Sequence, residues 1–476
     1  MNWYYEQAQI RKDGLLRDLK GLLAIPSVYD PATAGPRQPM GKGVADALRY
    51  MLDLCAVEGF RVTNHHGLVG YAEYGPEEAE HYIAVLSHLD VVPVSGEWVT
   101  PPFEPAIRDG KIYARGAIDD KGPAMASFYA LKIVKALGLP LKHRIRLIFG
   151  TDEERTHQCM ERYKELEPMP AWGFTPDAEF PIIAAEKGQI NTRIMFPPAR
   201  HEAESKGDYE LISFHAGVVA NMVPEAAEAV VTAAPDPLEA LEQAYQAYCS
   251  ENKLWGSVEH KGQTSVLHMA GKAAHGMEPH LGMNAGLALI HFLKDFSWNG
   301  GAGHYLNTVD ALLYNDVYGR AMGIAMEDDI SGPLTVNSGI LAYEPQGETF
   351  FHINLRFPIC GNYDDILKKI SEKLVGYRLE MEHPSLKKPH HVPGNHPMIR
   401  VLQETYLAET GEKAELLSTG GGTYAAHFPM GVAFGPLFPG MESTAHQPNE
   451  YMDIELLLRS TAIYARAVSE LGNLEL

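Results

Sequence analysis

Two short apolar runs constrain the fold of this chain more than any other feature. Tyr82 to Ser87 reads YIAVLS and Arg144 to Phe149 reads RIRLIF, and each run predicts a buried strand. Helical patterns occupy Val44 to Glu58 and Lys121 to Leu137, and Pro140 follows the second of them. Strands that alternate with helices predict an α/β domain whose mostly parallel sheet is flanked by helices on both faces.

The pattern changes near Lys187. Short strand-like runs follow, including Leu211 to Phe214 and Phe351 to Phe357, whose residues alternate as in a half-buried strand. Pro384 to Pro397 predicts a return crossing, and Ile454 to Leu471 is helical again. We therefore expect a domain made of residues 1–187 and 390–476, with an α+β domain of residues 188–389 inserted into it.

Composition excludes several classes of function. The chain has 476 residues, enough for two or three domains, with 40 Lys and Arg against 61 Asp and Glu. The formal charge of −21 repels a phosphate backbone, which argues against nucleic-acid binding. No apolar run reaches the roughly 18 residues that a membrane helix needs. The four cysteines are scattered without a CxxC pair, so we expect reduced thiols in a soluble cytoplasmic protein.

Histidine and acidic side chains adjoin the ends of several predicted elements. Their types suit divalent zinc or manganese, and paired acids offer one carboxylate for ligation and one for base chemistry. The segments are SHLD (87–90), IDD (118–120), TDEE (151–154), PDAE (176–179) and TAHQ (444–447).

Each segment also has a structural interpretation. A His-x-Asp sequence is usually a surface turn, a DD pair before a helix caps it, and an EE pair lies in a solvated loop. The signatures HExxH, G-x-S-x-G and G-x-x-x-x-G-K-[ST] are missing, which argues against the corresponding proteases, serine hydrolases and nucleotidases. The residues alone thus indicate a metallohydrolase and nothing narrower.

Six longer strings resemble the M20 family of metallopeptidases, and within it the bacterial PepV dipeptidase group, relatives of carnosinase. The resemblance covers nearly the whole chain in the expected order and implies a zinc-peptidase-like catalytic domain with an inserted lid domain. The strings are SHLDVVP (87–93), YARGAIDDKGP (113–123), GTDEE (150–154), GFTPDAEFP (173–181), GGGTYA (420–425) and HQPNE (446–450).

The resemblance implies two Zn²⁺ or Mn²⁺ ions. His88 and Asp177 would bind one ion, Glu154 and His446 would bind the other, and Asp119 would bridge them. The implied reaction is hydrolysis of the peptide bond of unblocked dipeptides by a metal-activated water.

Three further roles come from the same motifs. Glu153 would be the general base, and Asp90 would orient His88. The position two places before the lysine of D-x-K-G selects Asp119 over Asp120 as the bridge, and the family implies a cis peptide between these two residues.

The lid would supply a donor to the developing oxyanion. Gly271 to Gly276 (GKAAHG) resembles the lid motif whose histidine has this role, which points to His275. Without the resemblance, a histidine of a surface turn is the simpler interpretation.

The remaining motifs concern the substrate. Arg356 resembles an arginine that clamps a C-terminal carboxylate, although it could instead be a structural ion-pair partner. Asn221 resembles a lid asparagine that reaches the same region, and the backbone of Gly421, Gly422 and Thr423 would help to hold that end. Binding both termini would restrict substrates to about two residues.

The sequence departs from the family pattern after GTDEE. Arg155-Thr156-His157 stands where a small hydroxyl residue is usual, and Arg155 either lowers the pKa of Glu153 or points to solvent.

Other functions use the same scaffold. Deacylation of N-acyl amino acids, including succinyl-diaminopimelate, shares the metal motifs, but the large lid and Arg356 favour dipeptides. A non-catalytic peptide-binding homologue would have lost Glu153 or a ligand, and every such position is filled.

The enlarged lid is expected to imitate a dimer partner, which predicts a monomer.

Overall fold

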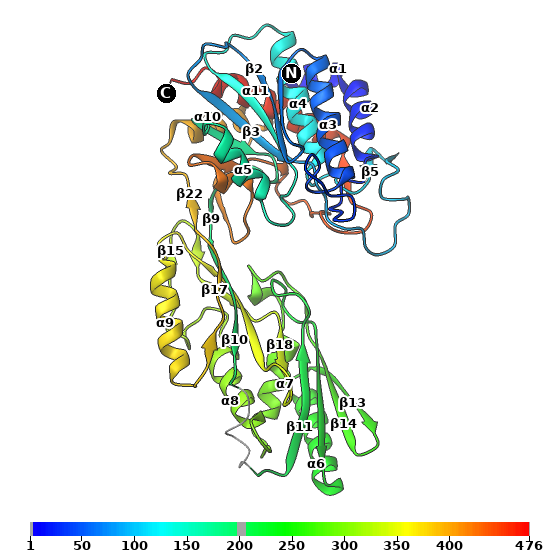
Figure 1. The fold of residues 1–476 in the computed structure, drawn as a ribbon, viewed down its shortest axis with the longest axis vertical. Coiled ribbons are helices and arrows are strands. Elements are labelled where there is room, and N and C mark those ends of the chain that lie inside the picture. The colour runs from blue at the N-terminus through cyan, green and yellow to red at the C-terminus, as the bar shows by residue number, and fades with distance from the viewer. Residues whose placement is uncertain (1–2, 198–205, 476) are drawn as a thin grey trace. The chain divides into compact units, whose positions relative to one another are not determined.

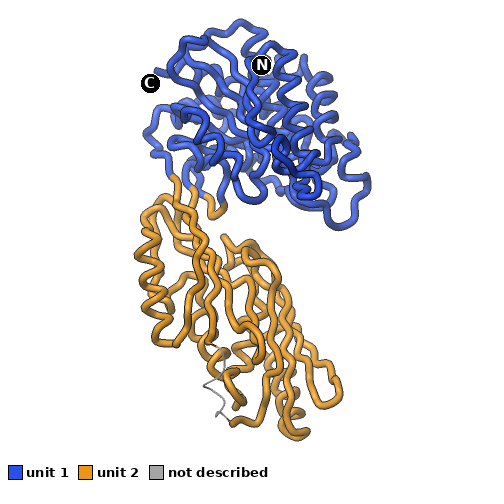
Figure 2. Tube along the Cα trace, in the orientation of Figure 1, with its two compact units in different colours: residues 1–185, 391–418, 422–476 blue, residues 186–390, 419–421 orange. Residues whose placement is uncertain are grey.

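The computed structural model describes residues 3–197 and 206–475, and the chain divides into two compact units. Unit 1 contains residues 1–185, 391–418 and 422–476, and unit 2 contains residues 186–390 and 419–421 (Figure 2). The sequence had assigned the segment 419–421 to the first domain. It belongs to unit 2 because the Lys187 N–H donates to the Thr419 carbonyl (2.9 Å) and Arg356 Nη1 donates to the Gly420 carbonyl (2.9 Å).

A nine-stranded sheet forms the centre of unit 1, in the order β1-β2-β6-β3-β7-β24-β9-β22 with β23 paired to β9. The strands β6, β3, β7 and β24 are mutually parallel, whereas β1, β2 and β9 pair antiparallel, which confirms the predicted α/β class. The strands are β1 (Arg61–His65), β2 (Val69–Tyr74), β3 (Tyr82–His88), β6 (Arg144–Gly150), β7 (Trp172–Thr175), β9 (Ile182–Glu186), β22 (His390–His391), β23 (Leu416–Thr419) and β24 (Gly431–Ala433).

Helices cover both faces of this sheet (Figure 1). In β3, Ile83 and Val85 join the core packed under α2, α3, α4 and α11, while Tyr82, Ala84 and Leu86 join a second core under α5 and η2. Every residue of β3 is therefore buried, which explains its continuous apolar run. The helices are α1 (Trp3–Ile10), α2 (Lys12–Leu23), α3 (Lys42–Val57), α4 (Lys121–Ala136), α5 (Gln158–Leu166), α10 (Pro397–Thr410), α11 (Ile454–Leu471) and the 3₁₀ helix η2 (Tyr424–His427).

Short strands complete unit 1. They form a three-stranded sheet and a two-stranded pair: β4 (Ala106–Arg108), β5 (Lys111–Tyr113) and β26 (Tyr451–Asp453), then β8 (Ala178–Glu179) and β25 (Pro436–Leu437).

Unit 2 contains a ten-stranded sheet in the order β13-β14-β12-β11-β18-β19-β10-β20, with β17 on β19 and β21 on β10. Its pairings are antiparallel, as expected for an inserted α+β domain. The strands are β10 (Gly188–Met195), β11 (Tyr209–Ala216), β12 (Ala226–Ala233), β13 (Trp255–Lys261), β14 (Thr264–Ala270), β17 (Thr335–Asn337), β18 (Leu341–Tyr343), β19 (Phe350–Phe357), β20 (Glu380–Met381) and β21 (Ser385–Lys387).

Strand β19 places core residues on one face and two polar residues, Asn354 and Arg356, on the other. Phe351, Ile353 and Leu355 enter the core, so Asn354 and Arg356 belong to the opposite face of the strand. The accompanying elements are α6 (Pro235–Glu251), α7 (Ala285–Leu293), α8 (Ala302–Leu313), α9 (Tyr363–Val375), the 3₁₀ helix η1 (Pro279–Leu281) and the hairpin strands β15 (Glu327–Asp328) and β16 (Gly332–Pro333).

Two further expectations can be compared with the described residues. All four cysteines are free thiols, three of them buried, as predicted. Among the described residues, no helix combines the length and the apolar character needed to cross a membrane.

Candidate metal centre

The carboxyl ends of three parallel strands bring the centre together. His88 is the last residue of β3, Glu153 and Glu154 follow β6, and Asp177 follows β7. Parallel strands end at the same edge of a sheet, which is where open α/β sheets hold ligands. Asp119 joins them from the turn before α4, so four segments far apart in the sequence meet at one edge.

Asp119 lies between the two histidines. Its Oδ1 is 3.0 Å from Nε2 of His88, and its Oδ2 is 2.9 Å from Nε2 of His446. His446 Nε2 is also 3.2 Å from Oε1 of Glu154, and His88 Nε2 is 3.6 Å from Oδ2 of Asp177. The five predicted ligands therefore lie together in unit 1, with Asp119 in the middle.

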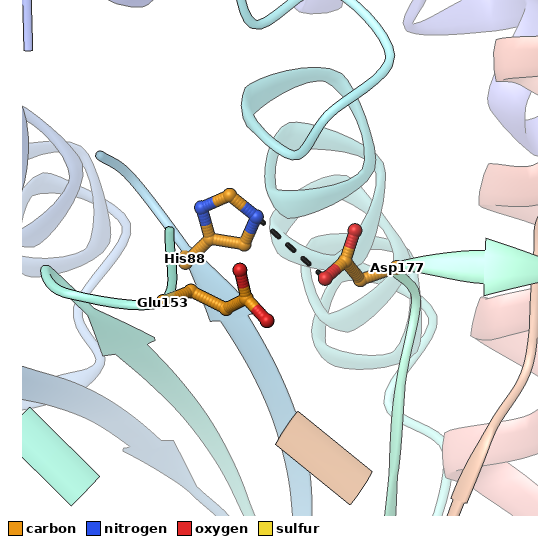
Figure 3. Close-up of side chains that lie close together, drawn as sticks. All are labelled: His88, Glu153 and Asp177. Carbon is orange, nitrogen blue, oxygen red and sulfur yellow. Dashed lines mark ion pairs between the residues drawn. The ribbon is translucent and has the colours of Figure 1, made fainter. Parts of the chain in front are cut away.

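Glu153 belongs to the same cluster. Its carboxylate, one ring nitrogen of His88 and a carboxylate oxygen of Asp177 all lie within 4.8 Å of one another (Figure 3). His88, Asp119 and Glu154 form a second group with the same spacing. The two groups share His88, so Glu153 lies beside the predicted ligands.

Asp90 holds its neighbours in two ways. Its backbone carbonyl accepts from Nδ1 of His88 (2.9 Å), while its carboxylate is 3.5 Å from that nitrogen. The carboxylate accepts instead from the backbone N–H groups of Glu153 (3.2 Å) and Glu154 (3.1 Å). Asp90 therefore fixes the His88 ring through its main chain and the Glu153-Glu154 turn through its side chain.

Asp120 does not face the two histidines. The His88 backbone N–H donates to Oδ2 of Asp120 (3.0 Å), and the Asp120 side chain is fully buried. The peptide between Asp119 and Asp120 is cis, as the family resemblance implied. Because the Asp120 carboxylate binds the His88 main chain whereas the Asp119 carboxylate faces both imidazole rings, the distances favour Asp119 over Asp120 as the bridging residue.

The acids and imidazoles strongly perturb one another. Burial raises the pKa of Glu153 well above its ordinary value and, together with neighbouring acids, raises that of Asp177 to about 6. Hydrogen bonds to Asp119 and Glu154 raise the pKa of His446 to about 10. The cluster thus carries an excess of acidic groups that two imidazolium ions only partly balance.

A divalent cation fits this donor set. The cluster offers His88 with four carboxylates, and His446 lies beside Asp119 and Glu154. Imidazole nitrogens and carboxylate oxygens are ligands that zinc and manganese bind in proteins. A cation would also relieve the mutual repulsion of the buried acids. The residues present therefore suit a metal centre on their chemistry alone.

Arg115 and Glu450 were not given a role by the sequence analysis. The structure buries both and pairs them at 2.6 Å, and Glu450 Oε1 accepts from the N–H groups of Ile118 (3.0 Å) and Asp119 (3.3 Å). Arg115 lies in YARGAIDDKGP and Glu450 lies in HQPNE, two of the strings that carry the family resemblance. Their place in these strings was the sequence signal that could have drawn attention to them.

Unit 2 contains His275, Asn221 and Arg356, three of the residues that were predicted to act on the substrate. The Gly276 N–H donates to the carbonyl of Asn221 (2.7 Å), which brings Asn221 beside His275. Nδ1 of His275 accepts from the Met277 N–H (3.2 Å), and burial and the charge of Arg356 lower the pKa of His275. A neutral His275 that accepts at Nδ1 carries its proton on Nε2.

Arg356 is buried without an acidic partner among residues 3–197 and 206–475. It donates to Oδ1 of Asn354 (3.1 Å) and to the carbonyl of Gly420 (2.9 Å), and burial lowers its pKa to about 10. The structural ion pair considered as an alternative is therefore not formed within the described chain.

The glycine-rich segment is divided between the units. Gly421 belongs to unit 2, and its N–H donates to the Thr419 hydroxyl (3.0 Å). Gly422 and Thr423 belong to unit 1, and the Thr423 hydroxyl accepts from the Ala425 N–H (3.0 Å) at the start of η2.

Arg155 is exposed and stacks on Tyr29, with its guanidinium carbon 3.5 Å from the ring centroid. Burial raises the pKa of Asp152, an effect that the charge of Arg155 only partly opposes, and burial raises the pKa of Glu153 as well. Arg155 was expected either to lower the pKa of Glu153 or to point to solvent, and the structure favours the second interpretation. His157 lies closer to the base, with Nε2 3.7 Å from Oε1 of Glu153.

The α/β unit and the ligand cluster at its sheet edge define a metal-dependent hydrolase. Residues 84–470 match peptidase family M20/M25/M40, and the chain therefore belongs to this family of metallopeptidases.

Relatives are similar over their full length. The chain is 44% identical to "Putative dipeptidase YtjP" of Bacillus subtilis (strain 168), over 99% of this chain and 100% of the relative. It is 38% identical to "Putative dipeptidase SH1171" of Staphylococcus haemolyticus, over 98% of each. The fold is also similar to that of human carnosine dipeptidase 1, with a TM-score of 0.56, 14% identity and 98% of each chain covered.

Proposed function

We propose that this protein is a metal-dependent dipeptidase that hydrolyses the peptide bond of unblocked dipeptides. The buried Arg356 carries the substrate part of this proposal. A guanidinium that is 4% exposed and meets no carboxylate within the described chain is costly unless an anion binds it. The terminal carboxylate of a short peptide is such an anion, and its planar shape fits the guanidinium fork. The curated relatives named above as dipeptidases support this choice.

The distances around Asp119 support the following assignment of metal ligands. His88 and Asp177 would hold one ion, Glu154 and His446 would hold the other, and Asp119 would contribute an oxygen to each. Zn²⁺ is the proposed ion, with Mn²⁺ as the alternative that the same donors accept. When bound, such ions polarise a scissile carbonyl and lower the pKa of water.

Glu153 would act as the general base. Its carboxylate takes a proton from the attacking water as the new C–O bond forms, and passes it to the leaving nitrogen as the C–N bond breaks. Burial raises the pKa of the Glu153 carboxyl, which makes it a stronger base than an exposed carboxylate. Asp90 would hold this base in place through the Glu153 and Glu154 N–H groups.

Residues of unit 2 would act on the substrate. The Nε2–H of His275 would donate to the oxygen that becomes negative when the carbonyl is attacked. Arg356 would bind the terminal carboxylate, assisted by Asn221 and the backbone of residues 421–423. Contacts at both ends of the substrate would exclude longer peptides.

A panel of substrates tests the proposal. Enzyme stripped with a chelator would be assayed on Leu-Gly, Ala-His and β-Ala-His, with matching tripeptides and N-acetylated amino acids, before and after adding Zn²⁺ or Mn²⁺. We expect cleavage of free dipeptides that appears only after metal is restored. Cleavage of the N-acetylated compounds alone would overturn the dipeptidase and favour deacylation on the same scaffold.

The oligomeric state is part of the proposal. We expect a monomer, because the insert of residues 188–389 resembles the enlarged lid that imitates a dimer partner. Sedimentation equilibrium at assay concentration tests this, and a dimer that loses activity on dilution would contradict it.

A further inference from the structure

The segment that carries His446 needs an external support. It contains no helix or strand, the His446 side chain is 55% exposed, and His446 and Asn449 both have positive φ angles, of 64° and 59°. Nevertheless Nε2 of His446 lies 2.9 Å from Oδ2 of Asp119. The bonds inside the loop do not involve Asp119 but join Thr444 to Tyr451 and Gln447 to Ser443.

A buried ion pair connects this loop to Asp119. Nη1 of Arg115 lies 2.6 Å from Oε2 of Glu450, and the two side chains are 1% and 0% exposed. The other oxygen of Glu450 accepts from the Asp119 N–H (3.3 Å) and the Ile118 N–H (3.0 Å). Nη2 of Arg115 donates to the carbonyl of His446 (3.2 Å). The pair therefore bonds to the main chain of both residues that face each other across the metal centre.

The far side of the loop is fixed as well. Oδ1 of Asn449 accepts from the Val99 N–H (2.8 Å), and its Nδ2 donates to the carbonyl of Glu97 (3.3 Å). These bonds hold the loop against residues 97–99 but reach neither Asp119 nor the His446 main chain. Within the described chain, only the Arg115–Glu450 pair contacts both the Asp119 main chain and the His446 main chain.

We propose that Arg115 and Glu450 are positioning residues that set the affinity of the metal position formed by Asp119, Glu154 and His446. This inference rests on the metal centre of the proposed function. Burying an ion pair costs desolvation that its attraction barely offsets, so such a pair is poor evidence of a stabilising role. Partners of the ligands, in contrast, commonly change metal affinity by about 10- to 100-fold.

A second buried ion pair provides the control. Glu73 and Arg146 lie 2.9 Å apart on β2 and β6, with side chains 8% and 4% exposed, and Arg146 also bonds to Tyr163 and Glu167, neither of which is a predicted ligand. Glu73→Gln and Glu450→Gln thus each remove one carboxylate charge from a buried ion pair, and Glu73 also lies 3.2 Å from Arg61 and 3.4 Å from Arg144. The two variants differ in whether the pair contacts the metal centre.

The experiment measures stepwise Zn²⁺ dissociation constants by competition with a chromophoric chelator, together with the unfolding temperature of the metal-free proteins. We expect Glu450→Gln to weaken one of two Zn²⁺ sites about 10- to 100-fold. Glu73→Gln should lower the unfolding temperature and leave both constants within about twofold. If Glu450→Gln lowers the unfolding temperature but keeps both constants, or if both variants weaken zinc equally, the positioning role is wrong.

Further variants keep the test decisive. If Glu450→Gln does not fold by circular dichroism, Arg115→Lys replaces it, because lysine keeps the charge but cannot bond to Glu450 and His446 together. Zinc binding without dipeptide cleavage would overturn the proposed substrate. The inference about Arg115 and Glu450 would then still be decided by the Zn²⁺ dissociation constants of the variants. If the unsubstituted protein binds zinc no better than the Asp119→Asn variant, both the proposed metal centre and the positioning role are wrong.

Discussion

Asp119 and His446 face each other at 2.9 Å, although they come from a turn before α4 and from a loop near the end of the chain. The other oxygen of the same carboxylate lies 3.0 Å from His88. One aspartate thus presents a different oxygen to each imidazole, which is the arrangement that a ligand shared between two ions requires.

We expect Asp119→Asn to lose both metal ions. Asparagine has nearly the same shape but one acceptor oxygen and no charge, so it cannot serve two cations. Metal content after dialysis against a weak chelator measures the effect. Asp46→Asn, which breaks a surface ion pair with Lys42 and Arg49 on α3, should keep both ions. Two ions retained by Asp119→Asn would show that the bridge is elsewhere.

Glu153→Gln should retain metal and lose turnover by about 100- to 10,000-fold. The amide keeps the size of the side chain and leaves the backbone bonds to Asp90 in place, but it cannot accept the proton of water. Paired measurements of kcat and metal content test this. Loss of metal in step with loss of turnover would make Glu153 a ligand, a role that its distance to His88 and Asp177 permits.

Local patterns predicted several of the main elements. The run YIAVLS corresponds to β3, the pattern from Lys121 corresponds to α4, and Ile454 to Leu471 corresponds to α11. These elements were predictable because burial on one or both faces leaves a periodic signature within a few residues. The ligand residues were proposed from long motifs, and the structure brings those of unit 1 together.

Contacts between distant segments were not predictable in the same way. Arg115 and Glu450 carry no periodic signal, and their pairing exists only once the turn before α4 and the HQPNE loop meet. The double use of Asp90 was missed for a similar reason, because its carbonyl and carboxylate serve different neighbours. Hydrogen bonds of this kind depend on tertiary geometry that residue spacing does not encode.

Arg356→Ala should raise KM much more for free dipeptides than for the same dipeptides amidated at the C-terminus. A C-terminal amide lacks the negative charge that a guanidinium binds. Removing Arg356 should therefore weaken the binding of the amidated dipeptide less than that of the free dipeptide. Arg193→Ala is the matched control in unit 2, because Arg193 pairs with Glu348 at the surface and should leave KM unchanged. Equal effects of Arg356→Ala on both substrates would remove its role as the carboxylate clamp.

We expect the ionised carboxylate of Asp328 to stabilise unit 2, and this stabilisation to be lost in acid. Although burial opposes its charge, hydrogen bonds lower its pKa: the carboxylate accepts from the N–H groups of Ser331 (2.6 Å), Cys360 (2.9 Å) and Ile330 (3.0 Å). A pKa below the unfolded value of about 3.9 means that this stabilisation is complete above that pH and is lost as pH falls through the folded value.

We therefore expect Asp328→Asn to lower the free energy of unfolding by about 1 kcal/mol at neutral pH, and the difference from the unsubstituted protein to shrink below about pH 4. Calorimetry at neutral and acid pH measures both quantities. Asp295→Asn, whose carboxylate is 74% exposed beside Lys294, should have little effect at either pH. A difference for Asp328→Asn that stays constant down to pH 3 would mean that its charge does not contribute, because only the ionised carboxylate gains from the three N–H donors.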